Sequence, residues 1–262
     1  MEDGSWKHGT VRFEFAKELI IIISAFYSPF MMVWDPTYVL IIIGMLLSLA
    51  ASGMVRSTYA KYSGVRAMSG MTGAQAAERI LHSKGIYDVR IEHVSGNLTD
   101  HYDPRSKVLR LSDTVFGSTS VAAIGVAAHE CGHAVQHQEG YAPLSIRTAI
   151  VPVTNFAATL SWPLILIGLL LSQRTGNLLI QIGILLFCAV VLFQLITLPV
   201  EFNASSRAIT LLKQNGILYE NEAKMTGKVL RAAALTYVAS AAASILQLLR
   251  LIILFGGRNR DD

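Results

Sequence analysis

Charged residues are missing from five long stretches of this chain, and the lengths of these stretches predict its architecture. The stretches contain 16, 20, 26, 26 and 18 residues and cover 19–34, 36–55, 148–173, 175–200 and 232–249. An α-helix needs about 20 mostly apolar residues to cross the hydrocarbon layer of a membrane. The last stretch reaches that length by continuing through Arg250 to Phe255, because an arginine near a helix end can extend to the lipid headgroups. We therefore predict four transmembrane helices, over 36–55, 148–173, 175–200 and 232–255.

The first of these stretches, residues 19–34, is too short to be counted as a crossing. Asp35 followed by Pro36 is typical of a helix start, with a capping residue before a proline in the first turn. We therefore interpret residues 1–35 as an N-terminal extension whose apolar segment is interfacial or re-entrant. Residues 256–262 form a short tail.

The composition agrees with a membrane protein. Hydrophobic residues make up 52% of the 262 positions and charged residues only 15%, and the mean hydropathy is +0.46. A soluble core of this size needs more charged surface. The net charge of +4 does not indicate nucleic-acid binding, because topology and contact with anionic lipids account for basic residues beside membrane helices.

The distribution of Lys and Arg between the predicted crossings indicates the topology. Residues 56–147 carry ten of them and residues 201–231 carry five, whereas the connection around Arg174 carries one. The positive-inside rule places the two richer segments in the cytoplasm. With four crossings, both ends of the chain are expected outside.

The segment 56–147 is long enough for a small α+β domain. Thr72 and Gln75 form a capping box, which predicts a helix over 73–84. An Ala/Val/Gly-rich stretch that follows a Ser/Thr cluster predicts a second helix, of about 20 residues, that ends at Gly140.

Between these helices lie two short runs with strand character, 89–94 and 107–111, separated by a turn-rich segment. We expect them to pair as an antiparallel ribbon.

The second predicted helix contains the sequence HECGH at residues 129–133. His129 and His133 are four residues apart, so a helix places both imidazoles on one face, within reach of one zinc ion. Glu130 lies about 100° further round the helix. There its carboxylate can act as a general base on the attacking water without binding the metal.

The third metal ligand must come from another segment. Three successive histidines on a straight helix cannot converge on one ion, so His137 is expected beside the site or on the surface. Several carboxylates compete for the role: Glu139, Glu201, Glu220, Glu222, Asp100, Asp103 and Asp113.

Topology favours Glu201 among these carboxylates. Residues 148–200 are predicted to form a membrane hairpin with its turn at 173–177, so the chain returns to the side where His133 left it. Glu201 is the first ionisable residue after the hairpin. Small residues share its helical face and would let the histidine helix approach closely; they are Ala204, Ser205 and Ala208.

Three separated motifs resemble those of a known family. They are LTDHYDPRSKVLRLS at 98–112, AAHECGHAVQH within 121–137 and PVEFNASSRA at 199–208. In order and spacing they resemble the bacterial membrane neutral zinc metallopeptidases of the YugP type, over about residues 30–260. The resemblance implies one zinc per chain, bound by His129, His133 and Glu201, with Glu130 catalytic.

A more distant similarity is to Ste24- and HtpX-like membrane metalloproteases. Their second motif has an aspartate where this chain has Ser205. A group other than aspartate must therefore orient a ligand histidine. Together these similarities imply a mainly α, polytopic membrane protein of the bacterial cell membrane with a small zincin-like cytoplasmic domain.

The expected reaction is zinc-assisted hydrolysis of peptide bonds in proteins or peptides at the membrane. The run 107–111 is a candidate edge strand for binding an extended substrate. The residues considered for transition-state or substrate contacts, which the sequence does not rank, are His101, Tyr102, His137, Asn203, Arg207 and Tyr237.

Three other classes of protein remain open at this point. A metal-binding or metal-transporting protein can use His and Glu at helical spacing, although the apolar stretches contain almost no ionisable residues to line a pathway. An intramembrane protease would place the zinc helix within a crossing, and a membrane scaffold would not use Glu130 at all. In each case the small residues 239–244 are expected to be a helix-packing face.

Overall fold

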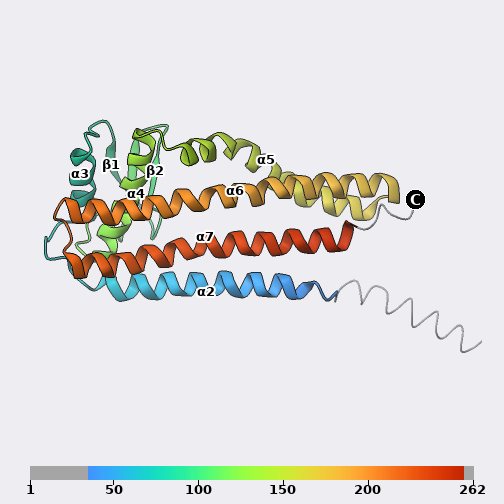
Figure 1. Cartoon of the computed structure of the whole chain (residues 1–262), viewed down its shortest axis with the longest axis horizontal. Coiled ribbons are helices and arrows are strands. Elements are labelled where there is room, and N and C mark those ends of the chain that lie inside the picture. The colour runs from blue at the N-terminus through green and yellow to red at the C-terminus, as the bar shows by residue number, and fades with distance from the viewer. Residues whose placement is uncertain (1–34, 257–262) are drawn as a thin grey trace, which may run out of the picture.

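The computed structural model describes residues 35–256, so the expectations for residues 1–34 and 257–262 lie outside the described part of the chain. Four long helices run along the longest axis of the molecule (Figure 1). They are α2 (Tyr38–Ser63), α5 (Ala142–Leu170), α6 (Gln173–Gln214) and α7 (Glu220–Phe255). The shorter helices α3 (Gly73–Ser83) and α4 (Val121–Gln138) gather with a small sheet at one end. The protein is therefore mainly helical.

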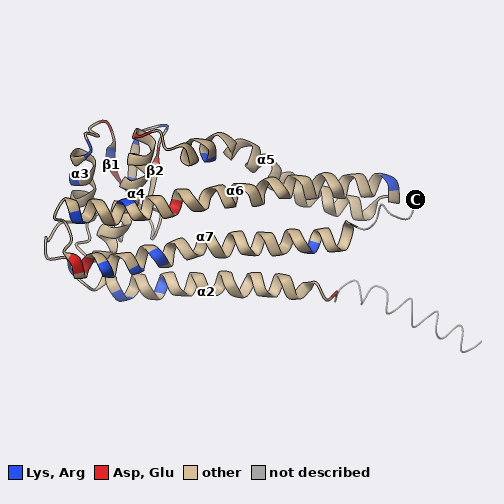
Figure 2. Cartoon of the chain, in the orientation of Figure 1, with Lys and Arg blue, Asp and Glu red and all other residues tan. Residues whose placement is uncertain are grey.

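All four long helices are long and apolar enough to cross a membrane, so residues 35–256 contain four candidate membrane-spanning helices, as the sequence predicted for this part of the chain. In Figure 2, charged residues gather around the end of the molecule that carries α3, α4 and the sheet. The helices extend beyond the predicted apolar stretches, since α6 continues past Val200 and α7 already begins at Glu220. Residues 201–214 contain no glycine or proline, and α6 ends just before Gly216, whose φ is +62°. The stretches without charged residues therefore mark the apolar part of each helix and not the ends of the helix.

Helices α5 and α6 form the predicted hairpin. Its turn is Leu171–Ser172, because α6 already begins at Gln173, where the sequence suggested a turn over 173–177. A Cβ added to Gly168 of α5 would lie only 2.7 Å from the carbonyl oxygen of Gly176 in α6. The two backbones can approach this closely because neither residue has a side chain.

Helices α2 and α7 form a second close pair. A Cβ added to Gly44 of α2 would lie 3.0 Å from the Cα of Ala243 in α7, and Ala239 and Ala241 are buried. This confirms that the small residues of α7 form a packing face. Near the opposite end of α7 from the sheet, the Arg250 guanidinium lies 3.3 Å from the Asp35 carboxylate.

The sheet differs from the predicted ribbon. Its order is β1–β3–β2, from strands β1 (Arg90–Val94), β2 (His101–Asp103) and β3 (Val108–Ser112). β1 pairs with β3 in parallel, and β2 pairs with β3 antiparallel. The predicted antiparallel pairing of 89–94 with 107–111 is wrong because the turn-rich segment contains a strand of its own, β2, and the chain reverses between β2 and β3. β3 is also not a free edge, since both of its sides are paired.

The two shorter helices confirm their predictions. Helix α3 begins at the capping box of Thr72 and Gln75. Helix α4 is capped by Ser120, whose side chain accepts a hydrogen bond from the backbone N–H of Ala123. Most of α4 is buried among α3, α6 and α7, so the helix that carries the histidines lies in the core of this end of the molecule.

The close contact between α4 and α6 yields a prediction for stability. A Cβ on Gly132 would lie 2.6 Å from the carbonyl oxygen of Ala204, a backbone atom that cannot swing aside. We expect Gly132→Ala to lower the free energy of unfolding by about 1–3 kcal/mol, because the packed helices must separate. The measurement is the thermal unfolding midpoint of the purified protein in detergent.

The control is Gly53→Ala on α2, where an added Cβ meets no atom within 4 Å. This change should be neutral or stabilise by up to about 1 kcal/mol through helix propensity. Equal midpoints for the two variants would contradict the close approach of α4 and α6.

Candidate metal centre

The structure brings His129 and His133 of α4 together with Glu201 of α6. One ligand atom from each residue lies within 4.8 Å of the others. The Nε2 atoms of His129 and His133 lie 3.3 and 3.6 Å from the same carboxylate oxygen, Oε2 of Glu201. The three side chains predicted from spacing and topology therefore converge on one point.

The environment of Glu201 fits a bound cation. Its side chain is only 2% exposed, and among the described residues its Oε2 atom has no hydrogen-bond partner. Oε1 faces the guanidinium of Arg147 at 3.5 Å. A buried carboxylate oxygen without a partner is costly, and an ion held between Oε2 and two imidazole nitrogens would remove that cost.

The protonation of His133 points in the same direction. Burial by itself lowers the pKa of His133, but the nearby carboxylates of Glu201 and Glu130 outweigh burial and raise the pKa above its ordinary value. The site therefore attracts positive charge, which a metal ion supplies as well as a proton does.

Two hydrogen bonds orient the histidines so that both Nε2 atoms face Glu201. Nδ1 of His129 lies 3.1 Å from the hydroxyl oxygen of Ser205, and Nδ1 of His133 lies 3.0 Å from Oε1 of Gln136. In the tautomer that leaves Nε2 free for a metal, each Nδ1–H donates to these oxygens. The side chain that contacts Nδ1 of His129 is thus a hydroxyl and not the carboxylate of an aspartate.

Gln136 is the functional residue that the sequence did not reveal. It is fully buried, and its Nε2 donates to the carbonyl oxygen of Val200 and to Oδ1 of Asn203, each at 2.9 Å. Arg207 donates to the same Asn203 oxygen at 2.7 Å and pairs with Glu139. Asn203 and Arg207 therefore support His133 indirectly, through Gln136. They are not among the residues that line the cleft described below.

Glu130 lies beside the three converging side chains but is not one of them. It is largely buried, and its Oε2 accepts a hydrogen bond of 3.0 Å from the backbone N–H of Tyr102 in β2. Because β2 pairs with β3 on its other side, this N–H belongs to the free edge of the sheet. The edge strand beside the site is therefore β2.

Three of the remaining candidates from the sequence, His101, Tyr102 and His137, lie on or beside β2. The hydroxyl of Tyr102 is 2.9 Å from Nδ1 of His137, so His137 contacts β2 and not the three converging side chains. Burial, with the charges of Asp88 and Asp103, raises the pKa of Tyr102 to about 12. Nδ1 of His101 lies 2.8 Å from the carbonyl oxygen of Thr99.

Each of the competing carboxylates has a partner of its own. Asp100 accepts hydrogen bonds from Ser112, Asp103 from Ser106, and Glu222 from the backbone of Met68 and Tyr219; Asp113 pairs with His93, Glu139 with Arg207, and Glu220 with Lys213. Among the described residues, His129, His133 and Glu201 are the only group of three or more His, Cys, Asp or Glu side chains placed to hold one metal ion.

Two cavities adjoin the converging side chains. The larger, a cleft of about 590 Å³, is lined by β2, by the residues that follow it, and by Arg147 and Tyr237. The smaller, of about 280 Å³, lies between α2, α4, α6 and α7. Both are lined by the same five residues, which are Asp100, His129, Glu130, Glu201 and Tyr237. The site is therefore open to a ligand from two sides.

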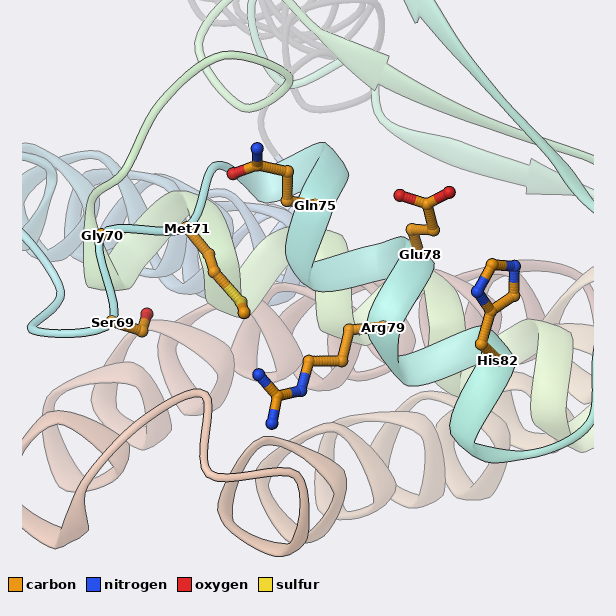
Figure 3. A pocket seen from close by; sticks show the side chains of 7 residues that line it. All are labelled: Ser69, Gly70, Met71, Gln75, Glu78, Arg79 and His82. Atoms are coloured by element: carbon orange, nitrogen blue, oxygen red, sulfur yellow. The ribbon is translucent and has the colours of Figure 1, made fainter.

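A separate hollow of about 550 Å³ lies along α3. Figure 3 shows that the Arg79 side chain points away from those of Glu78 and His82. The ionisable side chains that line this hollow therefore do not converge on one point. This hollow contains no counterpart of the cluster on α4 and α6.

Comparison with known proteins agrees with this site. The family model described as "Putative neutral zinc metallopeptidase" matches residues 37–256. One relative, "Putative membrane protease YugP" of Bacillus subtilis (strain 168), is 52% identical over 216 residues, which cover 82% of this chain and 95% of the relative. No solved structure matches the chain. The likeness extends over the long helices as well as the small sheet.

The hydrogen bond between Ser205 and His129 can be tested by metal binding. We expect Ser205→Ala to weaken zinc affinity by about tenfold or more, because His129 loses the group that fixes its ring. The measurement is competition for zinc with a chromophoric chelator. Ser206→Ala is the matched control, since Ser206 is the exposed neighbour, and equal affinities of the two variants would refute the role of Ser205.

Proposed function

Because the chain belongs to this family of neutral zinc metallopeptidases, we propose that it is a membrane-bound zinc endopeptidase whose active centre lies between α4 and α6. The observation that carries the proposal is the convergence of His129, His133 and Glu201 on one point, with the carboxylate of Glu130 beside it. Its substrates are proteins or peptides at the membrane.

His129, His133 and Glu201 would hold one zinc ion per chain. When bound, zinc supplies Lewis-acid polarisation of the scissile carbonyl and makes water more acidic. Glu130 takes the proton from the attacking water and returns it to the leaving amine. The N–H of Tyr102 holds this carboxylate in place at 3.0 Å, so the base is aligned before substrate arrives.

The substrate binds in an extended form along β2. This strand replaces 107–111 as the proposed binding edge, because β3 has a partner on each side. An extended chain can add to such a strand edge by backbone hydrogen bonds. Because the N–H of Tyr102 already donates to Glu130, it is the carbonyl oxygen of Tyr102 that would accept a hydrogen bond from the substrate. Arg147, Tyr102 and Tyr237 line the cleft and are the proposed hydrogen-bond donors for the oxygen that gains charge during the reaction.

The active centre faces the cytoplasm. Most Lys and Arg residues lie at the end of the molecule that carries α3, α4 and the sheet (Figure 2), and this end is cytoplasmic by the positive-inside rule. Residues 36–55, 148–173, 175–200 and 232–255 are the proposed membrane crossings. Residues 56–147 form the proposed zincin-like catalytic domain, and residues 201–231 form a cytoplasmic helical segment that carries the third zinc ligand.

Substitution of the two glutamates separates catalysis from metal binding. Glu130→Gln should retain about one zinc per chain and lose peptide hydrolysis by at least about a hundredfold, because the proton acceptor is gone. Glu201→Ala should lose both zinc and activity, because a ligand is missing. The measurements are elemental analysis of the purified protein and cleavage of a quenched fluorescent peptide mixture.

Glu78→Gln, an exposed glutamate on α3, is the control and should behave as the unsubstituted protein. Hydrolysis retained by Glu130→Gln would exclude the mechanism, and zinc retained by Glu201→Ala would place the third ligand elsewhere. Zinc flux into vesicles without any cleavage would favour a transporter.

The proposed orientation predicts the access of a thiol reagent from outside the cell. In a Cys188→Ser background, a membrane-impermeant maleimide should label Arg174→Cys, at the α5–α6 turn, in intact cells. Lys84→Cys, next to α3, should be labelled only after the membrane is permeabilised. Both side chains are exposed, so the reverse pattern would invert the topology.

A further inference from the structure

The two cavities beside the metal centre differ in chemistry. The larger cleft has polar and charged walls, which include His101, Asp103, Arg105 and Arg147. Away from the five shared residues, the smaller pocket is lined by two hydroxyl residues, Ser205 and Thr236, and by six aliphatic ones; they are Val55, Leu98, Val126, Leu230, Ala233 and Ala234. A mainly aliphatic recess thus begins beside His129, Glu201 and Glu130.

We propose that this apolar pocket receives one leucine-sized aliphatic side chain of the substrate, next to the scissile bond. The inference rests on the proposed endopeptidase function and adds a substrate class to it. At about 280 Å³, the pocket lies at the low end of the range of ligand sites, roughly 300–1,000 Å³. It suits a single side chain better than a whole small molecule.

The aliphatic walls of the pocket belong to three different helices of the protein. Leu230 is buried in α7, Val126 stands three residues before His129 on α4, and Val55 belongs to α2. The two hydroxyls in this part of the pocket are already engaged, that of Ser205 with His129 and that of Thr236 with the carbonyl oxygen of Ala233. A charged or amide side chain placed against these walls would therefore lose hydration that they do not replace. An aliphatic side chain gains by leaving water.

The outer rim of the pocket is formed by Leu98. This residue precedes β2, is half exposed, and adopts φ of +57°, a conformation that is unfavourable for a leucine. Asp113 holds the loop through the backbone N–H of Gly96 at 2.8 Å, and Asp100 holds it through Ser112. The loop thus keeps an aliphatic side chain in the lining of the pocket.

Crosslinking tests the pocket without requiring hydrolysis. The probe is an extended peptide of small residues with one central photoreactive leucine, bound to zinc-loaded, full-length Glu130→Gln protein. Mass spectrometry should locate the crosslinks at Val55, Leu230 or Ala233. A peptide with leucine at the centre should compete at least about tenfold better than one with alanine, since such size differences in apolar pockets are worth 10- to 200-fold.

Two pocket variants and one control sharpen the competition experiment. Ala233→Leu fills the pocket and should remove the preference for leucine over alanine, whereas Val55→Ala enlarges it and should raise the relative affinity for a phenylalanine peptide. Ala60→Leu on the exposed face of α2 makes the same change as Ala233→Leu outside the pocket and should leave the preference unchanged. Normal zinc content shows that each variant is folded.

The outcomes separate the subsite from the catalytic proposal. Crosslinks confined to other surfaces, or a leucine preference that survives in Ala233→Leu, would overturn the subsite even if the unsubstituted protein cleaves peptides. Crosslinks in the pocket without cleavage by the unsubstituted protein would support the subsite as a binding site and overturn the endopeptidase function.

Discussion

The burial of the Glu201 carboxylate between α4 and α6 is the constraint on which the rest of the structure depends. A carboxylate with a side-chain exposure of 2% is strongly disfavoured unless positive charge or donors surround it. Here Oε1 lies 3.5 Å from the Arg147 guanidinium, and Oε2 lies 3.3 and 3.6 Å from the two imidazole Nε2 atoms. The arrangement holds only if α4 lies against α6, which the missing side chain of Gly132 permits. The convergence of the three candidate ligand side chains therefore depends on the packing of α4 against α6.

The α5–α6 hairpin returns the chain from His133 to Glu201. His133 and Glu201 belong to segments separated by α5 and most of the apolar part of α6. Close packing of α5 on α6 at Gly168 and Gly176 fixes the two crossings relative to each other. The apolar helices thus also set the position of Glu201 relative to His129 and His133, the three side chains that we propose as metal ligands.

The sequence predicted the parts of the site that depend on local periodicity or on topology. The histidine pair follows from helical spacing, Glu201 from its place directly after the hairpin, and α3 from a capping box. Gln136 was missed because a glutamine within a helix is usually solvated, and only the packing of α6 at Val200 and Asn203 buries it. The parallel pairing of β1 with β3 was missed for a similar reason: strand partners are chosen by non-local contacts, and the short β2 has little pattern of its own. The ends of the long helices were missed because charged residues bound only the apolar stretch of each helix. Helix α6, for example, continues past the charged Glu201 and ends just before Gly216.

The depth of the site limits which parts of a substrate can reach it under the proposed function. Glu201 directly follows the uncharged stretch 175–200, and Val55 is the last residue of 36–55. The metal centre and the apolar pocket therefore lie level with the cytoplasmic ends of the apolar stretches. Within the hydrocarbon layer a substrate helix keeps all its backbone hydrogen bonds internal, and unwinding it there exposes unpaired polar groups. At the boundary, water and the free edge of β2 can satisfy those groups. Cleavage is then favoured where an aliphatic segment emerges from the bilayer, since such a segment can be extended along β2 while one of its side chains remains in an apolar pocket.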